Sequence, residues 1–326
     1  MRVGSPEPSG DRAERVNHMV HTRWPLIALA ALSLASPTAT AQEPRDHLLA
    51  RVGAYVDAWE RELGSVVADE DYQQTVKRQQ RLGAIDRARR PAFETRRLTS
   101  EFTLVHFDDG LAEWLGFRHV TRVNDIPVND GRPRLNQLMN DASLSWRERW
   151  RRVRDLSAVF NLGSISRDFN VPTFALAALR TARHVHFSFS TPRSDRVDGT
   201  IFTLLEFNER GRPSLVTGAG GRDVPLRGKV WVDAADGRVR RTELTLRDRL
   251  YIPTTEPGDA PMQDDLLTSR LTVVFGPDAQ VGTWVPVEMR EQYDSSNGEQ
   301  TLGRATYSNY RRFRTGGRVV GPARQQ

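Results

Sequence analysis

The chain has 326 residues, of which 38% are hydrophobic and 27% charged, and its formal net charge is +6. Because it contains no cysteine, disulfide bonds, thiol chemistry and an acylated cysteine anchor are excluded. The basic residues are nearly all arginines and no nucleic-acid recognition motif is present. We therefore expect no nucleic-acid partner, and consider instead an anionic envelope surface such as lipid or lipopolysaccharide.

The N-terminus has the features of a secretory signal peptide. A mostly apolar run, Trp24 to Ala35, precedes Ala39-Thr40-Ala41, the small-x-small pattern that a signal peptidase needs. We expect residues 1–41 to be removed, with Met19 as an alternative start that gives a short basic leader. The run is shorter than the roughly 20 apolar residues of a spanning helix. We therefore expect a periplasmic or extracellular protein with no transmembrane segment after cleavage.

Cleavage leaves about 285 residues, enough for one large domain or two small ones. The first region, 42–179, is predicted to be helical with one pair of strands. Apolar residues recur at spacings of three and four between Asp46 and Ala68, which predicts a helix. Asp69-Glu70-Asp71 and the polar stretch Gln73 to Arg90 indicate a solvated helix or a loose connection.

A strand pair and two helices complete this region. The strands are expected at 101–107 and 116–123, with an Asn124-Asp125 turn into residues 126–128. A second helix is predicted from Ser145 to Phe160, with its tryptophans on one face. A short, buried helix is predicted from Pro172 to Leu179, opened by proline in its first turn.

The second region, 180–326, reads as an antiparallel β-meander. Short turn signals such as Asp236-Gly237 separate alternating stretches, and short connections favour antiparallel neighbours. The predicted fold class is α+β, with a curved antiparallel sheet forming an open or half barrel that is covered by N-terminal helices. The strands are predicted at 183–190, 200–208, 229–233, 238–247, 266–275, 284–293 and 303–313.

No catalytic motif of a zinc peptidase, serine hydrolase or P-loop enzyme occurs. His184 and His186 share one face of a predicted strand, but no third ligand is evident, so we expect solvent-facing histidines and no metal site. Asp233 to Gly237 is interpreted as a hairpin turn and not as a calcium loop. The glycine-rich stretch 218–221 is interpreted as a flexible loop, because no strand and helix flank it as in a dinucleotide site. We predict no catalytic residue and no cofactor.

Asp69, Glu70 and Asp71 could supply an acid and base pair, since neighbouring carboxylates serve hydrolysis. Adjacent side chains on a helix do not face each other, so a solvated helix end is the simpler interpretation. A hydrolase with dispersed catalytic residues stays open as an alternative.

Three C-terminal stretches resemble the closing strands of periplasmic LolA-like lipoprotein carriers and LppX-type lipid binders: "GKVWVDAADGRVRRTEL" (228–244), "WVPVEMREQY" (284–293) and "ATYSNYRRF" (305–313). The mature chain also resembles uncharacterised secreted bacterial proteins at "YVDAWERELGSVVADEDY" (55–72) and "FNLGSISRDFNVPTFALAAL" (160–179). The LolA-like resemblance implies a strongly curved, incomplete barrel whose apolar concave face holds acyl chains under a helical lid. It covers about the last 130 residues and carries over no binding residue.

The leading hypothesis is a non-catalytic exported protein that binds an apolar ligand, a lipid or a lipoprotein acyl chain. The first alternative is a structural or interaction protein of the cell envelope with a solid core, in which the basic helix at 145–160 docks a partner. For each candidate ligand-binding residue, ordinary core packing is the competing interpretation. The candidates are Phe187, Phe189, Leu205, Phe207, Val230, Val273, Val287 and Met289 on the strands, with Trp150 and Phe174 from the lid.

Overall fold

The computed structural model describes residues 44–78, 92–107, 113–128, 135–163, 167, 169–218, 222–252, 263–296 and 298–312, without the side chains of 248–252 and 263–266. The signal peptide expected at 1–41 lies outside the described residues. So do residues 79–90 of the predicted polar stretch and residues 219–221 of the glycine-rich loop.

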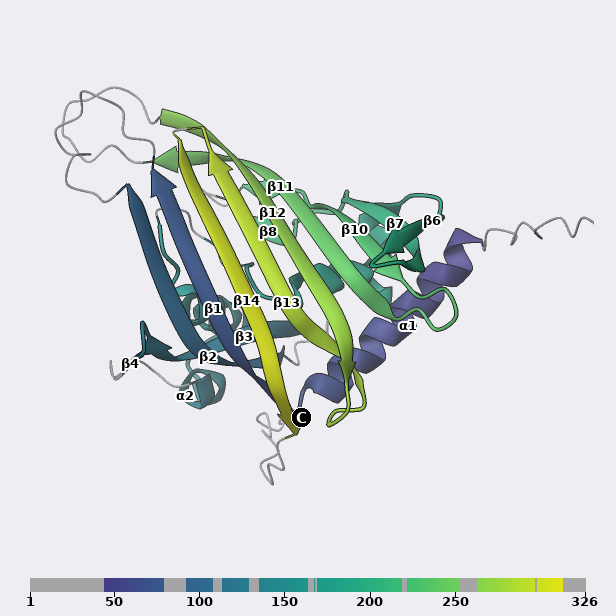
Figure 1. Ribbon diagram of the computed structural model, residues 1–326, viewed down its shortest axis with the longest axis horizontal. Helices are drawn as coiled ribbons and strands as arrows, with labels where there is room; N and C mark the ends of the chain where they lie inside the picture. The colour runs from purple at the N-terminus through teal and green to yellow at the C-terminus, as the bar shows by residue number, and fades with distance from the viewer. Residues whose placement is uncertain are drawn as a thin grey trace, which may run out of the picture. The chain divides into compact units, whose positions relative to one another are not determined.

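The fold is α+β, built on one large antiparallel sheet (Figure 1). Its helical segments are α1 (Arg45–Leu63), α2 (Leu135–Asn140), α3 (Trp146–Ala158) and the short 3-10 helices η2 (Phe174–Leu179) and η3 (Thr181–His186). Its strands are β1 (Val66–Arg78), β2 (Phe93–Phe107), β3 (Glu113–Val123), β4 (Ile126–Pro127), β5 (Phe187–Phe189), β6 (Arg193–Val197), β7 (Thr200–Glu209), β10 (Arg227–Val232), β11 (Val239–Ile252), β12 (Gln263–Asp278), β13 (Thr283–Ser295) and β14 (Glu299–Arg312). A separate small hairpin comprises β8 (Val216–Thr217) and β9 (Asp223–Val224).

The order of strands in the large sheet is β4-β3-β2-β1-β14-β13-β12-β11-β10-β7-β5, and β6 also pairs with β7. The predicted meander is confirmed from β10 to β14, where each strand pairs with the next. The last strand then pairs with the first, so that yellow β14 lies between β13 and blue β1 in Figure 1. Within the described residues, the two ends of this order, β4 and β5, do not pair, so the sheet is not a closed barrel.

Two of the expectations for the N-terminal half are wrong. The helices do not form an N-terminal block, because β1 to β4 separate α1 from the remaining helices. The stretch that was expected to be a solvated helix or a loose connection contains β1, a central strand paired on both sides. Within it, Asp69, Glu70 and Asp71 occupy strand positions where alternate side chains face opposite sides of the sheet.

Helix α1 packs on the inner face of the sheet, which we define as the face that carries Tyr72, Leu205 and Met289. The apolar stripe expected from its sequence is buried, and the ring of Trp59 lies 6.3 Å from that of Phe275. The Trp59 indole also donates a hydrogen bond of 2.6 Å to the Trp284 carbonyl. The helix is therefore held by both apolar packing and directed polar contacts.

Helix α3 packs at the other side of the sheet and protects an edge. Its predicted start is confirmed by a capping box, in which Ser145 and Glu148 bond each other's backbone amides. Near its other end, the Ser157 hydroxyl accepts a 3.0 Å hydrogen bond from the Arg118 backbone amide in β3. This contact satisfies a strand-edge amide that could otherwise pair with another chain.

Candidate functional site

The inner face was the candidate ligand site, and most of the predicted ligand-binding residues meet there. Phe187, Leu205, Phe207, Val230, Val273, Met289 and Phe174 belong to one buried apolar cluster, and half-buried Phe189 packs against it. The ring centroid of Phe207 lies 5.8 Å from that of Phe187 and 6.2 Å from that of Phe189, which are ordinary aromatic packing distances. The side chains of these residues therefore pack against one another.

Two predicted ligand-binding residues lie elsewhere. Trp150 on α3 packs against a separate cluster that includes Phe117 and Val153, with the Arg154 guanidinium 4.3 Å from its ring centroid. Val287 lies at a register shift between β12 and β13. Pro286 before it pairs with Phe275, and Glu288 after it pairs with Val274. It is half-buried and is not a member of the inner cluster. Val287 therefore does not join the other strand candidates in the inner cluster, and Trp150 does not pack against that cluster as a lid residue would.

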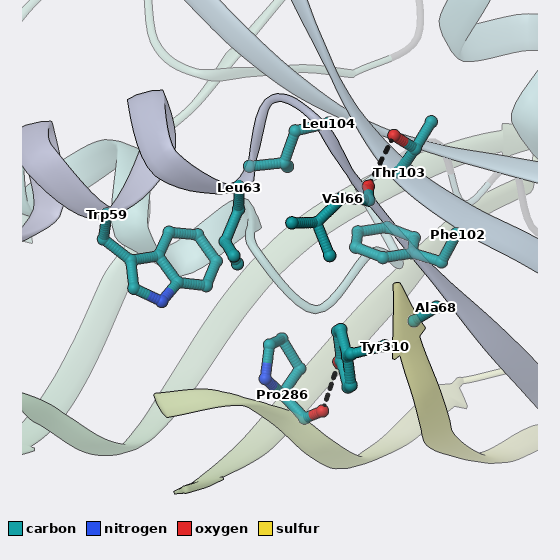
Figure 2. A pocket seen from close by; sticks show the side chains of 9 residues that line it. All are labelled: Trp59, Leu63, Val66, Ala68, Phe102, Thr103, Leu104, Pro286 and Tyr310. Atoms are coloured by element: carbon teal, nitrogen blue, oxygen red, sulfur yellow. Dashed lines mark hydrogen bonds between the residues drawn. The ribbon is translucent and has the colours of Figure 1, made fainter. Parts of the chain in front are cut away.

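A small apolar pocket lies where α1 meets the sheet (Figure 2). Its volume of about 10 Å³ holds about one water molecule, whereas ligand pockets usually measure about 300–1,000 Å³. Its lining is bonded internally, since the Tyr310 hydroxyl donates to the Pro286 carbonyl and Thr103 to the Val66 carbonyl. The lining residues are Trp59, Leu63, Val66, Ala68, Phe102, Thr103, Leu104, Pro286 and Tyr310.

A segment that follows α3 crosses the inner face, and we call its described residues between 161 and 180 the strap. Arg167 in the strap is buried and donates a hydrogen bond to Glu291 of β13. It also donates to the Gln74 side chain at 2.6 Å and to the Leu162 carbonyl at 2.8 Å. The second oxygen of Glu291 accepts a 2.8 Å hydrogen bond from the Tyr293 hydroxyl. The strap is thus fixed to the centre of the sheet by polar contacts.

A second buried ion pair lies beside the first. The Arg118 guanidinium donates to both oxygens of Glu70, at 2.8 Å for one of them, and to the Asn170 carbonyl of the strap at 3.1 Å. The Tyr307 hydroxyl donates to the same carboxylate at 2.8 Å. Both side chains of the ion pair are fully buried. Glu70 is therefore bonded to Arg118 and Tyr307, in the same way that Glu291 is bonded to Arg167 and Tyr293.

Tyr72 connects the two ion pairs. Its hydroxyl donates to Glu291 and accepts from Asn170 at 3.1 Å, while the Arg118 guanidinium lies 4.4 Å from its ring centroid. Burial, followed by the negative charge of Glu291, raises the pKa of Tyr72 well above its ordinary value. The phenol therefore stays protonated and acts as a hydrogen-bond donor rather than as a base.

A third buried ion pair holds the end of the strap. Arg180 donates to Glu60 of α1 through two nitrogens at 2.8–2.9 Å, and to the Trp114 carbonyl of β3 at 2.8 Å. Burial raises the pKa of Glu60, and the nearby Arg180 opposes this shift. The strap is consequently bonded to α1 as well as to the sheet.

The other candidate catalytic and metal-binding groups do not converge. The predicted strand at 183–190 is wrong over most of its length, because His184 and His186 lie in η3 and only 187–189 form a strand. Among the described residues, no group of three histidine, aspartate or glutamate side chains could hold a metal ion. Glu70 points inward, whereas Asp69 and Asp71 point outward and pair with Arg311 and Arg97. The carboxylate triplet is therefore divided between two faces.

The predicted turn at Asp233 to Gly237 is confirmed, whereas the turn predicted at Gly276-Pro277 is wrong, because both residues lie in β12 and pair with β13. At Asp233 to Gly237, the Asp233 carbonyl accepts from the Gly237 amide at 2.9 Å, and Gly237 has a φ of +76°. The Asp233 carboxylate accepts from the Ala235 amide, which is turn chemistry rather than metal ligation. In the part of the chain that the structure describes, no helix is long and apolar enough to cross a membrane.

Comparison with known proteins adds a single structural likeness. No family model matches the sequence, and no curated protein matches it. Among solved structures, it is similar to a chain in the crystal structure of MucB in complex with MucA(peri), at 9% identity over 82% of this chain and 99% of that chain. The TM-score is 0.20, which is too low to carry an argument about fold or function.

Proposed function

We propose that the chain is a non-catalytic interaction protein of the cell envelope with a solid core. The observation that supports this most directly is that the residues expected to line a ligand cavity pack against one another. Leu205 and Val230 have no exposed surface, and Phe207 is 1% exposed. A protein whose inner face is occupied by its own α1 and strap binds its partners on the outside.

The strap also bears on the alternative of acyl-chain binding. An acyl chain could enter the inner face only if the strap moved, which would break the Arg167–Glu291 and Arg180–Glu60 ion pairs. Separating a buried pair leaves uncompensated charge, at a cost of about 3–5 kcal/mol for each. We therefore favour the interaction protein over the lipid carrier.

The hydrolase alternative receives less support from the same contacts. A general acid or base must reach a substrate proton, and the two carboxylates at the centre of the inner face are fully buried. Their hydrogen bonds come from buried arginine and tyrosine side chains. This arrangement is typical of a structural network rather than an open catalytic cleft.

Native mass spectrometry of the protein purified from its own periplasm tests the proposal. We expect the mass of the mature polypeptide alone under gentle conditions. A stoichiometric acyl lipid that survives purification would overturn the proposal in favour of the lipid carrier.

Overpacking offers a second test that needs no native material. In a solid core, Val230→Phe is expected to lower the free energy of unfolding by about 1–3 kcal/mol, since the added atoms have no space. Beside an empty acyl cavity, the same change would be neutral or stabilising. Ile201→Phe, at a position that is 64% exposed, is the matched control and should have little effect.

A further inference from the structure

The outer face of the sheet carries a group of arginines that the solid core does not explain. We call Arg97, Arg270, Arg290 and Arg304 the arginine platform. They lie on β2, β12, β13 and β14, and all four side chains are exposed. Among the described residues, helix α3 packs on the outer face near Val105 and Phe107 of β2 and near Leu115 and Phe117 of β3, and the platform side chains remain exposed.

The strand register places three of these arginines in one row across the sheet. Arg290 of β13 pairs directly with Arg304 of β14, which pairs with Gln73 of β1, which in turn pairs with Arg97 of β2. Because neighbouring strands lie about 4.8 Å apart, the row extends over about 15 Å. On the other side of Arg290, its partner on β12 is Thr272, two residues from Arg270.

The Arg290–Arg304 pair is unfavourable for the sheet by itself, since like charges directly opposite each other repel. Both guanidinium groups bind Glu288, and Arg304 does so at 2.7 Å. Burial raises the pKa of Glu288, but hydrogen bonds from Arg304 and Arg290 outweigh it and lower the pKa overall. One carboxylate thus neutralises only one of two arginines that are 61% and 66% exposed.

The other two platform arginines, Arg97 and Arg270, do not remove this excess of positive charge. Arg97 is neutralised by Asp71 at 2.6 Å. Arg270 has no carboxylate partner within the described residues. Arg270 thus has no bonded carboxylate, and Arg290 and Arg304 share one, beside hydrogen-bonding side chains at Gln73, Thr272 and Gln292 and the Asp294 carboxylate that Gln292 binds. A flat array of this kind suits a ligand that presents repeated anionic and hydroxyl groups.

We propose that the arginine platform binds an anionic polysaccharide through its carboxylate, sulfate or phosphate groups. This proposal rests on the proposed function, because it names the partner class of an external interaction surface. Membrane insertion and the core of a protein interface both require exposed apolar or aromatic side chains. Of the exposed large hydrophobic residues in the described chain, only Phe93 lies on β1, β2 or β11 to β14, four residues before Arg97. The surface therefore favours a polar polymer over a membrane or an acidic protein.

Affinity electrophoresis of the mature full chain through gels that contain polygalacturonate, dextran sulfate or neutral dextran tests the proposal. We expect both anionic polymers to retard the protein, neutral dextran to have no effect, and added salt to weaken the retardation. The triple variant R270Q/R290Q/R304Q should bind at least about tenfold more weakly, because each arginine near an anionic surface contributes about a factor of five.

A matched control separates the platform from net charge. R147Q/R151Q/R152Q removes three exposed arginines from α3 and should leave polymer binding within about threefold of the original. Equal loss in both triple variants would overturn the proposal, as would equal retardation by neutral dextran. Binding only to phosphatidylglycerol vesicles would also overturn it, in favour of a membrane surface. If the triple variant folds poorly, Arg270→Gln alone is the test, with about fivefold weaker binding expected.

The outcomes keep this proposal separate from the proposed function. Suppose that the protein carries no lipid and that Val230→Phe destabilises it, but that neither anionic polymer binds. This result would overturn only the polysaccharide partner. A retained acyl lipid would overturn the solid-core interaction protein, whatever the polymers show.

Discussion

Arg167 and Glu291 form a fully buried ion pair although 124 residues separate them in the sequence. The pair joins the strap to β13, and Tyr72 of β1 donates to the same carboxylate. Three distant segments therefore share one charged centre beneath the sheet. The centre fixes the strap in place on the inner face of the sheet.

Glu291→Gln should destabilise the protein strongly, because it leaves the Arg167 charge buried without its counter-ion. The expected loss in free energy of unfolding is about 3–5 kcal/mol, measured by urea denaturation. Glu62→Gln is the matched control, since it breaks an ion pair with Arg312 in which both side chains are 43% exposed. The control should change stability by no more than about 1 kcal/mol, and equal losses in the two variants would contradict the prediction.

Gly237→Ala and Gly282→Ala separate backbone conformation from steric contact. Both glycines have positive φ, at +76° and +79°, so alanine is strained at either position by about 1–2 kcal/mol. A Cβ atom at Gly237 would also lie 2.7 Å from the backbone of Arg51 in α1, whereas at Gly282 it meets nothing within 4 Å. Gly237→Ala should therefore lower the thermal midpoint clearly more than Gly282→Ala. Equal shifts would show that the β10–β11 turn is not packed on α1.

Ser157→Ala should release the edge of β3. Removing the hydroxyl leaves the Arg118 amide without its acceptor and is expected to cost about 1–3 kcal/mol. Hydrogen exchange at the Arg118 amide, measured by NMR, should become faster than in the original protein. Ser145→Ala removes a hydroxyl from the same helix, at its N-terminal cap, and should cost about 1 kcal/mol without specifically exposing that amide.

Asp223 should contribute to stability in a pH-dependent way. Hydrogen bonds from the Ser214 amide, and then from Arg212, lower the pKa of its carboxyl below the ordinary value of 3.8. The unfolded state therefore binds the proton more readily, and the stabilisation is present above pH 3.8 and lost as the pH falls through the folded pKa. The difference in unfolding free energy between the original protein and Asp223→Asn should shrink below about pH 4. A constant difference from pH 6 to pH 3 would be inconsistent with this cause.

The elements that could be predicted from the sequence depend on local signals. Helix α3 has a capping box and an apolar stripe within its own residues, and the β10–β11 turn has its glycine and aspartates in place. The strands from β10 to β14 are consecutive in the chain, and each pairs with the next. Elements whose signals lie within their own residues could therefore be predicted from the sequence.

Strand β1 could not be predicted in this way because three consecutive inward positions at its centre are polar or hydroxylated. Glu70, Tyr72 and Gln74 are buried at alternate positions, but a pattern search looks for apolar residues there. Their polar groups are satisfied by Arg118 and Arg167, which come from other parts of the chain. Only the tertiary contacts make this strand compatible with a core. The same limit applies to η3, whose Val185 is 84% exposed although its alternation with Phe187 indicated a strand.

The pairing of β1 with β14 also determines when the native state can form. These strands align from Val66 opposite Arg312 to Arg78 opposite Glu299, so the sheet joins two segments that are far apart in the sequence. During synthesis β14 emerges last, and until then β1 lacks one of its two neighbours and Glu70 lacks Tyr307. Pairings this distant in sequence slow folding, because a long loop must close first. The large sheet therefore cannot be completed until β14 has been synthesised.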